Sequence, residues 1–368
     1  MLHIVGSFHQ GGSEYQAVQL IRLLREEGSF RILTACLNRS GPLLNEIAEL
    51  DALEVPEFPL TSFYDRNFIR QIRAFSRFVR KNNISVLQTH DFYTNVFGMA
   101  AGVVSGVPLR IAAKRETGMR SFPQRFIERR AFNLAHRIVV NAGTVKRYLV
   151  DSGVPQGKIV TIHNGLDPLR VGPPGKARRA ILDEFGLPNA SGARYVTILA
   201  NLRSHVKNHR MFLHAAKIAS ELVPDANFIV AGEGELMAET RELAAKLGIT
   251  ERTFFIGRCT NVADLLSITD VGVLSSVSEG FPNSILEYMA ASVPVVAAAV
   301  GGVAEAVADQ ETGFLVEMND HIAMADRIIE VLKDTSKAAS MGQRGRERVD
   351  KYFTLENQLN KTLQLYGA

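Results

Sequence analysis

Cysteine and long apolar runs are both scarce in this sequence. Only two cysteines, Cys36 and Cys259, occur among 368 residues. Their wide separation excludes a disulfide framework and fits a reducing compartment. The longest nearly apolar run, residues 96–109, contains three glycines and a proline. It is shorter than the roughly 20 residues of a membrane-spanning helix, so we expect no transmembrane helix.

A basic leader is also missing. The sequence enters a strand-like segment at residues 2–5, which predicts no signal peptide and a cytoplasmic location. Hydrophobic residues make up 46% and charged residues 22% of the chain. This composition is ordinary for a soluble globular protein and excludes a mainly disordered or collagen-like chain. At roughly 150 residues per domain, the length predicts two domains.

Acidic residues are few in the first half. The net charge of +4 combines 21 basic and 13 acidic residues within positions 1–165 with an acidic excess in the remainder. Residues 66–147 are the most unequal window, with 16 basic and 3 acidic residues. Such asymmetry indicates an anionic partner for the basic half.

Short strand-like runs alternate with helical segments along most of the chain. The expected strands are 2–5, 31–37, 53–58, 84–89, 109–113, 137–141, 159–162, 195–200, 227–231, 253–257, 271–275, 294–298 and 313–316. The expected helices are 13–27, 65–81, 94–105, 122–135, 143–151, 206–221, 235–247, 262–268, 283–291, 303–308, 320–332 and 354–366. This alternation predicts parallel sheets covered by helices on both faces.

Glycine and proline gather in residues 165–192, which we interpret as a linker between two doubly wound α/β domains. We place the first domain at 1–168 and the second at 169–351. For the final helix, about 352–368, packing on the first domain stays open as well as packing on the second. Ligands of such sheets bind beyond the carboxyl ends of the strands. We therefore expect an active site in a cleft between the two domains, built from strand-to-helix loops.

Two of these loops carry groups that suit anions. Gly11 and Gly12 precede the first helix, where backbone N–H groups and the helix dipole favour negative charge. A tight turn without a ligand is the alternative interpretation. Arg203 and Lys207 lie four residues apart at an expected helix start. Together they suit a diphosphate, and the alternative is a solvated pair of cations.

Two carboxylates follow a later strand. Glu279 lies in the loop and Glu287 lies eight residues further on, in an apolar helix. Carboxylates accept hydrogen bonds from hydroxyl groups, so both suit hydroxyl-rich ligands such as a ribose and a hexose. Loop solvation for Glu279 and a surface position for Glu287 are the alternatives.

Eight short motifs occur in an order that resembles one enzyme family. They are Gly11-Gly12-Ser13-Glu14, Asn164-Gly165-Leu166-Asp167, Leu202-Arg203 with Lys207-Asn208, Gly232-Glu233-Gly234, Phe255-Ile256-Gly257, the segment from Glu279 to Glu287, Gly301-Gly302-Val303-Ala304-Glu305 and Thr312-Gly313-Phe314-Leu315-Val316. The chain resembles the retaining glycosyltransferases of family 4, also called glycosyl transferases group 1. The resemblance covers nearly the whole chain.

The resemblance implies the GT-B fold, in which two Rossmann-like domains face each other across a cleft. It implies that a hexose moves, with retention, from a UDP- or GDP-linked sugar to a hydroxyl of a glycan or a lipid-linked glycan. The first domain would bind the acceptor and the second the donor, in the synthesis of cell-surface polysaccharide or lipopolysaccharide. Neither a cofactor nor a metal is implied, and the sequence contains no Asp-x-Asp.

Donor-site roles follow from the same resemblance. Arg203 and Lys207 would hold the donor diphosphate and stabilise the leaving group, and Gly12 would donate its backbone N–H to the same phosphates. Glu287 would bind the ribose and Glu279 the sugar. The remaining implied donor contacts are the backbones of Gly280 and Phe281 at the sugar, and Arg258 and Cys259 near the nucleobase.

The acceptor side is less well defined. His90 ends an expected strand, and the resemblance implies that it acts near the sugar or the acceptor. A strand-end histidine bonded to backbone is the alternative. Many relatives have a histidine after the next strand, where this chain has Lys114 to Gly118. Arg115 or Glu116 is then the candidate for contacting the acceptor.

Residues 65–81 predict an amphipathic helix. Arg66, Arg70, Arg73, Arg77 and Arg80 share one helical face, whereas Phe68, Ile72, Phe75 and Val79 share another. Together with the basic segment 110–130, this face suits an anionic membrane surface, such as the inner face of a membrane, or a lipid diphosphate. A sheet-packing helix with a solvated basic face is the alternative.

Two other functions remain open from the sequence. One is another GT-B nucleotide-sugar enzyme, such as an epimerase, which would turn over donor without an acceptor. The other is a non-enzymatic protein that binds anions or membranes. Because RNA-recognition motifs, zinc-ligand spacing and a stacking series of aromatics are all missing, we do not expect a nucleic-acid partner.

Overall fold

The computed structural model describes residues 1–9, 11–48, 54–117 and 120–367. Several sequence predictions extend beyond these ranges. Gln10 of the first loop, Leu53 of the expected strand 53–58, and Gly118 and Met119 of the basic segment lie outside the described residues.

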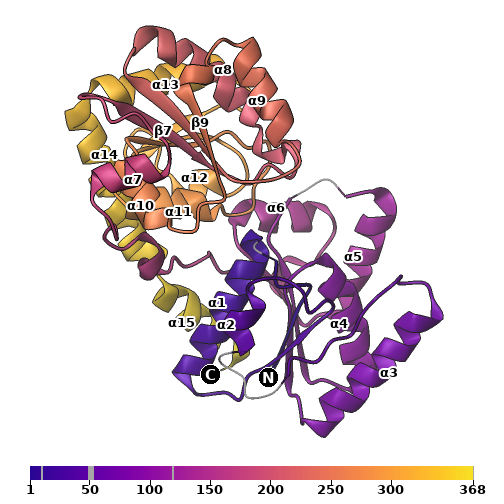
Figure 1. Ribbon diagram of the computed structural model, residues 1–368. Coiled ribbons are helices and arrows are strands. Elements are labelled where there is room, and N and C mark those ends of the chain that lie inside the picture. Colours follow the sequence, from indigo (N-terminus) through magenta and orange to yellow (C-terminus); the bar gives the residue numbers. More distant parts are fainter. Residues whose placement is uncertain (10, 49–53, 118–119, 368) are drawn as a thin grey trace. The chain divides into compact units, whose positions relative to one another are not determined.

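Two compact units make up the chain (Figure 1). The first comprises Met1–Asn164 and Leu355–Ala368, and the second comprises Gly165–Thr354. The boundary therefore lies after Asn164 rather than after residue 168. Its physical cause is a pairing within the second unit, where Leu166 donates its N–H to the carbonyl of Phe353 at 2.8 Å and forms a bridge with Thr354.

The first unit contains a parallel sheet with strand order β2-β1-β3-β4-β5-β6. Its strands are β1 (Leu2–Val5), β2 (Leu33–Cys36), β3 (Val86–Thr89), β4 (Leu109–Lys114), β5 (Arg137–Val140) and β6 (Ile159–Thr161). Its helices are α1 (Gly12–Glu27), α2 (Leu44–Ala48), α3 (Arg66–Lys81), α4 (Phe92–Ser105), α5 (Phe122–Leu134), α6 (Gly143–Asp151) and α15 (Leu355–Tyr366), with a short 3₁₀ turn at Gln156–Lys158.

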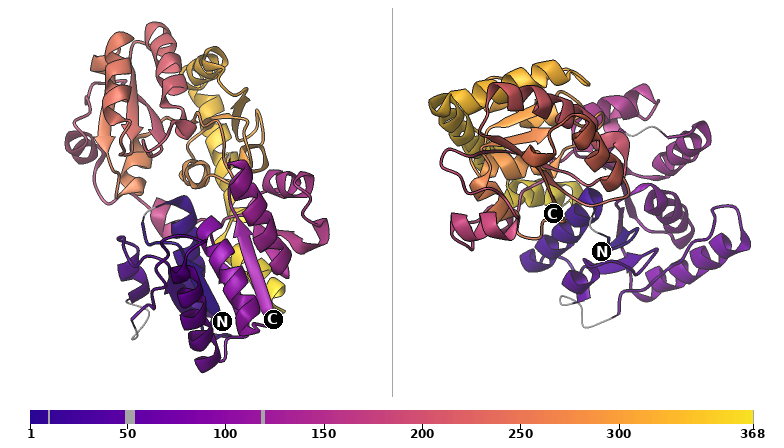
Figure 2. Two further views of the ribbon diagram at one scale, coloured as in Figure 1. Left: turned by 90° about the vertical axis from the view of Figure 1, so that its right-hand side faces the viewer. Right: turned by 45° about the horizontal axis from the view of Figure 1, so that its top comes forward.

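Separate apolar clusters cover the two faces of this sheet. On one face, Ile21 and Leu24 of α1 pack with Val5 and with Tyr366 of α15. On the other face, Phe75 and Val79 of α3 and Phe97 of α4 pack against Ile4 and Leu87. The final helix thus belongs to the first unit, and Figure 2 shows both chain termini there.

The second unit has a sheet with strand order β12-β11-β10-β7-β8-β9, also all parallel. Its strands are β7 (Arg194–Leu199), β8 (Ala226–Ala231), β9 (Thr253–Gly257), β10 (Val271–Leu274), β11 (Val295–Ala298) and β12 (Gly313–Val316). Its α-helices are α7 (Arg178–Glu184), α8 (His209–Leu222), α9 (Met237–Lys246), α10 (Val262–Ile268), α11 (Asn283–Ala290), α12 (Val303–Ala306), α13 (His321–Lys333) and α14 (Thr335–Tyr352). Three 3₁₀ turns are η2 (Pro168–Val171), η3 (His205–Lys207) and η4 (Thr250–Arg252).

The prediction of two doubly wound parallel sheets is confirmed. Two of the predicted segments are wrong. The described part of the predicted strand, residues 54–58, forms only an isolated bridge between Glu57 and Cys36, because Pro56 has no N–H with which to extend a ladder. The predicted linker 165–192 is part of the second unit. It contains η2 and α7, and Ile181 and Leu182 of α7 lie in the core beside Tyr195.

The strand orders locate one switch point in each sheet. In the first unit, the chain reverses direction across the sheet between β1 and β3. In the second, it reverses between β7 and β10. Ligands of open α/β sheets bind beyond the carboxyl ends of the strands at such points. The loops after β1 and β3, and those after β7 and β10, are therefore the expected positions of ligand-binding residues.

Candidate functional site

In the second unit, the loops after β7 and β10 are tied to each other. Val277 donates its N–H to the carbonyl of Val206 at 2.8 Å. The Ser275 hydroxyl lies 3.0 Å from the carbonyls of both Lys207 and Asn208. These contacts fix the positions from which Lys207 and Glu279 project at the switch point.

Lys207 and Glu279 form an ion pair there. Lys207 Nζ lies 2.6 Å from Glu279 Oε1, and the Ser276 hydroxyl donates to the same oxygen at 2.6 Å. The Glu279 side chain is only 10% exposed and that of Lys207 is 23% exposed. A half-desolvated pair of this kind is oriented by its surroundings and strengthened by low local polarity. It offers a cation to phosphate and an acceptor to hydroxyl groups.

Arg203 is exposed, and its loop is held by backbone contacts. Leu202 donates its N–H to the carbonyl of Glu233 at 2.9 Å and accepts from the N–H of Leu236 at 2.9 Å. The expected helix start at residue 206 is wrong. Asn208 is left-handed (φ 48°) and caps α8, which begins at His209. Arg203 and Lys207 thus precede the helix instead of forming its first turn.

The backbone around Gly280 is buttressed by the loop after β11. Gly302 donates its N–H to the carbonyl of Gly280 at 2.7 Å. Gly301 is left-handed (φ +55°), and a Cβ there would overlap the carbonyl group of Glu279. The ring of Phe281 is buried against Phe353, with centroids 5.2 Å apart. Phe281 therefore anchors the loop by its side chain, which leaves only its backbone for the predicted ligand contact.

Glu287 is buried in α11 and paired with a residue that the sequence analysis did not select. Only 4% of its side chain is exposed, and Arg170 Nε donates to Oε1. The predicted alternative of a surface position for Glu287 is wrong. Arg170 lies in η2, three residues after the Asn164–Asp167 motif. No local pattern reveals it, because its partner is 117 positions away.

The two residues expected near a nucleobase differ in exposure. Arg258 is exposed, whereas Cys259 is half-buried. Burial raises the pKa of the Cys259 thiol to about 11; Arg170 lowers it and Glu287 raises it. Cys259 thus shares the surroundings of the Arg170–Glu287 pair. The roles given to Arg203, Lys207, Glu279, Gly280, Phe281, Glu287, Arg258 and Cys259 stay predictions.

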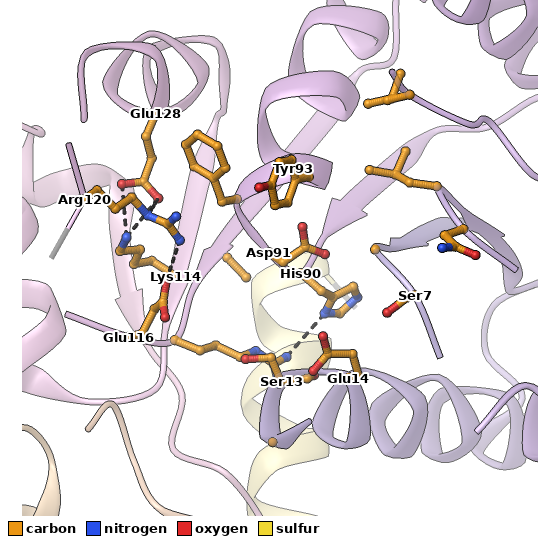
Figure 3. Close-up of a pocket in the computed structure, with 18 residues that line it drawn as sticks. Ser7, Ser13, Glu14, His90, Asp91, Tyr93, Lys114, Glu116, Arg120 and Glu128 are labelled. Atoms are coloured by element: carbon orange, nitrogen blue, oxygen red, sulfur yellow. Dashed lines mark hydrogen bonds and ion pairs between the residues drawn. The ribbon is translucent and has the colours of Figure 1, made fainter. Parts of the chain in front are cut away.

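The switch point of the first unit opens into a cavity of about 610 Å³ (Figure 3). It is lined by residues that follow β1, β3 and β4 and by the first turn of α1. Gly12 is the first residue of α1, and Glu14 lies in the same turn. The Glu14 carboxylate folds back over Gly11, where the helix dipole favours negative charge. Burial raises the pKa of Glu14.

His90 lies on this cavity, between two basic partners. An Arg115 guanidinium nitrogen lies 3.3 Å from His90 Nδ1, and His90 Nε2 lies 3.0 Å from His3 Nδ1. Burial lowers the pKa of His90 well below its ordinary value and lowers that of His3 to about 3. Both ring contacts of His90 are with side chains, whereas the alternative interpretation was a strand-end histidine bonded to backbone.

Arg115 and Glu116, the two residues considered for acceptor contact, have different partners. Arg115 also donates to the carbonyl of Ser13, at 3.5 Å. Glu116 pairs instead with Arg120. Sequence analysis missed a buried ion pair on the same cavity, in which Lys114 Nζ lies 2.9 Å from Glu128 Oε1.

The amphipathic character of α3 is confirmed. Its five predicted arginines are all exposed. Phe75 and Val79 are buried, and Phe68 and Ile72 pack against the same core cluster.

Within the described residues, no helix combines the length and apolarity needed to cross a membrane. The same residues contain no group of three or more His, Cys, Asp or Glu side chains placed to hold a metal ion.

Two family descriptions match consecutive parts of the chain. "Glycosyltransferase Family 4" matches residues 10–170, and "Glycosyl transferases group 1" matches residues 183–348. Between them they span most of both units.

Individual relatives carry related names. The chain is 32% identical over 183 residues to the N-acetyl-alpha-D-glucosaminyl L-malate synthase of Bacillus anthracis, which covers 50% of this chain and 47% of that protein. The chain thus spans about half the length of this relative. It is 25% identical over 370 residues to an Escherichia coli UDP-Gal:alpha-D-GlcNAc-diphosphoundecaprenol alpha-1,3-galactosyltransferase, covering 96% of this chain and 93% of that protein.

A solved structure has the same fold. Anabaena Alr3699/HepE, in complex with UDP, superposes with a TM-score of 0.85 at 18% identity, and the match covers 100% of this chain and 99% of that one.

Proposed function

Because this chain belongs to the family 4 (group 1) glycosyltransferases, we propose that it moves a hexose from a UDP-linked sugar to a hydroxyl of a glycan or a lipid-linked glycan. The observation that carries the proposal is the Lys207–Glu279 ion pair at the switch point of the second unit. There, one side chain suits a diphosphate and the other suits sugar hydroxyls.

The donor and acceptor classes draw on the relatives. One relative is named for a UDP-galactose donor and a diphosphoundecaprenol-linked acceptor, and a protein of the same fold was solved with UDP. The sequence alone leaves UDP and GDP equally open. We choose UDP on the basis of these names.

We propose that transfer proceeds with retention and without a metal. The bond between the anomeric carbon and the donor phosphate oxygen breaks, and a bond from the acceptor oxygen to the same carbon forms on the same face. The acceptor proton passes to the departing phosphate oxygen. Arg203 and Lys207 neutralise the diphosphate, Glu279 binds sugar hydroxyls, and Glu287, oriented by Arg170, binds the ribose.

A thermal-shift panel tests the donor site. UDP, GDP and ADP are each added, with and without EDTA, to the wild type and to Arg203→Ala. Arg203 is exposed, so its removal leaves the fold intact. UDP at about 100 times its dissociation constant adds about 2.7 kcal/mol of stability. We expect a UDP shift that EDTA does not change and that is smaller in the variant.

Other outcomes contradict parts of the proposal. A shift with GDP alone overturns the choice of donor, and loss of the shift in EDTA overturns metal independence. The absence of any shift rejects the donor site. If UDP-sugar is consumed equally well without an acceptor, the epimerase or hydrolase alternative replaces transfer.

We also propose that the exposed arginines of α3 contact an anionic membrane surface. All five project into solvent, whereas the opposite face of the helix is buried in the core of the first unit. A row of basic side chains of this kind attracts anionic lipid headgroups at about 1 kcal/mol per residue.

A further inference from the structure

The cavity of the first unit is not basic, although the unit as a whole is. Among the described residues, its ionisable lining groups are three cations, four carboxylates, the imidazole of His90 and the phenol of Tyr93. The cations and carboxylates are Lys114, Arg115 and Arg120, and Glu14, Asp91, Glu116 and Glu128. The arginines of α3 are not among the lining residues. The basic excess of the unit therefore lies on its outer helix and not in its cavity.

Four of these charges neutralise one another along one wall of the cavity (Figure 3). Lys114 Nζ lies 2.9 and 3.0 Å from the two oxygens of the buried Glu128. Arg120 Nε lies 3.4 Å from Glu128, and Arg120 also pairs with Glu116. The Arg120 guanidinium stacks over the Phe92 ring at 4.3 Å. Both cations of this wall already face carboxylates, and drawing either cation to a ligand would strand a buried carboxylate.

Asp91 and Glu14 line the cavity away from this network (Figure 3), and Arg115 is also among the lining residues. Asp91 caps α4, since its carboxylate accepts the N–H of Thr94 at 2.9 Å. Among the described residues, no carboxylate lies within ion-pair distance of Arg115. Arg115 instead contacts the Ser13 carbonyl and His90, and these two contacts use two of its five N–H donors.

The contacts of His90 determine its protonation. An arginine only donates hydrogen bonds, so Nδ1 of His90 must carry the lone pair that accepts from Arg115. The proton of the neutral ring then lies on Nε2 and is donated to Nδ1 of His3, 3.0 Å away. Burial lowers the pKa of both imidazoles, which keeps both neutral. Both ring nitrogens of His90 are therefore occupied within the protein.

We propose that this cavity binds a neutral, hydroxyl-bearing ring of the acceptor, with Arg115 donating to its oxygens and His90 acting as the positioning residue that holds Arg115. The inference rests on the proposed transferase function. A hydroxyl group accepts from Arg115 and donates to a carboxylate such as Glu14. A phosphate or carboxylate on the acceptor would instead face the carboxylates of Glu14 and Asp91, with Arg115 as the one lining cation outside the Lys114–Arg120 wall, at a high desolvation cost. This role for His90 differs from the action near the sugar or the acceptor that the family resemblance implies.

Matched pairs of methyl hexosides test the ring class. Methyl glucoside, galactoside and mannoside are each compared with the uronide of the same ring, which differs only by a carboxylate at C6. Saturation-transfer NMR on the full chain with UDP measures binding. We expect at least one neutral ring to bind about tenfold or more tightly than its uronide. Equal or tighter binding of the uronides, or no saturation transfer from any neutral ring, overturns the inference.

Two substitutions test the role of His90. His90→Gln keeps an acceptor for Arg115 and a donor for His3, whereas His90→Leu keeps neither. With the preferred acceptor, we expect His90→Leu to raise the acceptor KM about tenfold or more with little change in the donor KM, and His90→Gln to restore most of the loss. If His90→Gln lowers kcat about a hundredfold at an unchanged acceptor KM, His90 acts on the reacting atoms and the inference is wrong.

A matched control and a second variant keep the test decisive. His136 also pairs with an arginine, Arg110, at 3.3 Å, but it does not line the cavity. His136→Leu should leave the acceptor KM unchanged. If His90→Leu does not fold, the acceptor KM of Arg115→Lys is measured instead. A lysine keeps the charge but cannot contact both Ser13 and His90. Failure of the UDP thermal shift rejects the proposed function itself, whereas a UDP shift without ring discrimination rejects only this inference.

Discussion

In the second unit, each of the two candidate carboxylates is held by a cationic side chain. Glu279 is paired with Lys207, and Glu287 with Arg170. Each cation offsets the desolvation of its carboxylate, so a charged acceptor can persist in a half-buried or buried position. Removing either cation would leave a carboxylate that is both costly and poorly oriented. These pairs therefore serve the fold as well as the proposed chemistry.

Gly301 is the residue whose replacement should affect the Glu279 loop most directly. An alanine at this position would have to adopt a left-handed backbone, and its Cβ would clash with the Glu279 carbonyl. We expect Gly301→Ala to cost about 2–5 kcal/mol of unfolding free energy and to reduce the UDP thermal shift. Urea denaturation and the nucleotide panel provide the measurements.

Gly186 supplies the control for this substitution. It has a similar backbone (φ +64°), but nothing lies within 4 Å of a Cβ built there. Gly186→Ala should cost only about 1–2 kcal/mol and leave the UDP shift intact. Equal losses in the two variants would show that the contact with Glu279 has no effect of its own.

Sequence analysis at this scale finds residues that stand in local motifs and misses their distant partners. Lys207, Glu279 and Glu287 could be chosen because each lies in the loop or the helix that follows an expected strand. Arg170 and His3 could not, since their roles arise from side chains 117 and 87 positions away. The Lys114–Glu128 pair was missed for a related reason, because a lysine that ends a strand does not by itself indicate burial.

At the scale of elements, strongly periodic segments were predicted well and polar ones were not. The positions of the twelve strands in the part of the chain that the structure describes were anticipated, because buried parallel strands form short apolar runs. Helix α14 was missed, since its sequence is polar and contains Gly342 and Gly345. A glycine at 342 is not a helix breaker here. A Cβ would overlap the backbone of Ser292, so the glycine permits close packing of α14 on the loop after α11.

Helix α3 carries the prediction that belongs to this scale. Replacing Arg70, Arg73 and Arg77 with glutamine removes three exposed charges and leaves the buried face unchanged. We expect co-sedimentation with phosphatidylserine-containing vesicles to weaken about tenfold or more and to fall with added salt in the wild type. Vesicles of neutral lipid measure any contribution that does not depend on charge.

A triple substitution in the second unit controls for net charge. Arg178, Arg179 and Arg210 are also exposed, and their replacement with glutamine removes the same charge from other helices. If this control weakens vesicle binding as much as the α3 variant does, the total charge matters and α3 does not form the contact.

For the whole molecule, the main feature is that the first unit is made of two separate stretches of sequence. Residues 1–164 form its sheet, and α15 completes the layer beside α1. Gln358 and Thr362 of α15 are buried, and the Tyr366 hydroxyl donates to the Gln88 side chain. The two-domain division was predictable from the restart of the strand pattern. The bridge of Leu166 with Thr354, which sets the boundary, was not.

Removal of residues 355–368 tests the contribution of α15. The deletion exposes the apolar surface of α1 and leaves Gln88 without its partner. We expect hydrogen–deuterium exchange to show loss of protection throughout residues 1–164 and little change in residues 165–354. Removing only residues 367 and 368 is the control and should leave protection as in the wild type. Equal loss in both units would show that they unfold together.

The order in which a ribosome releases these segments gives the split unit a further significance. All of the second unit emerges before α15, so a nascent chain can finish the later unit while the earlier one still lacks its last helix. During that interval the part of α1 that packs against α15 is exposed, and it is a surface that chaperones could recognise. Synthesis of the C-terminal helix is therefore the step that completes the N-terminal half of the protein.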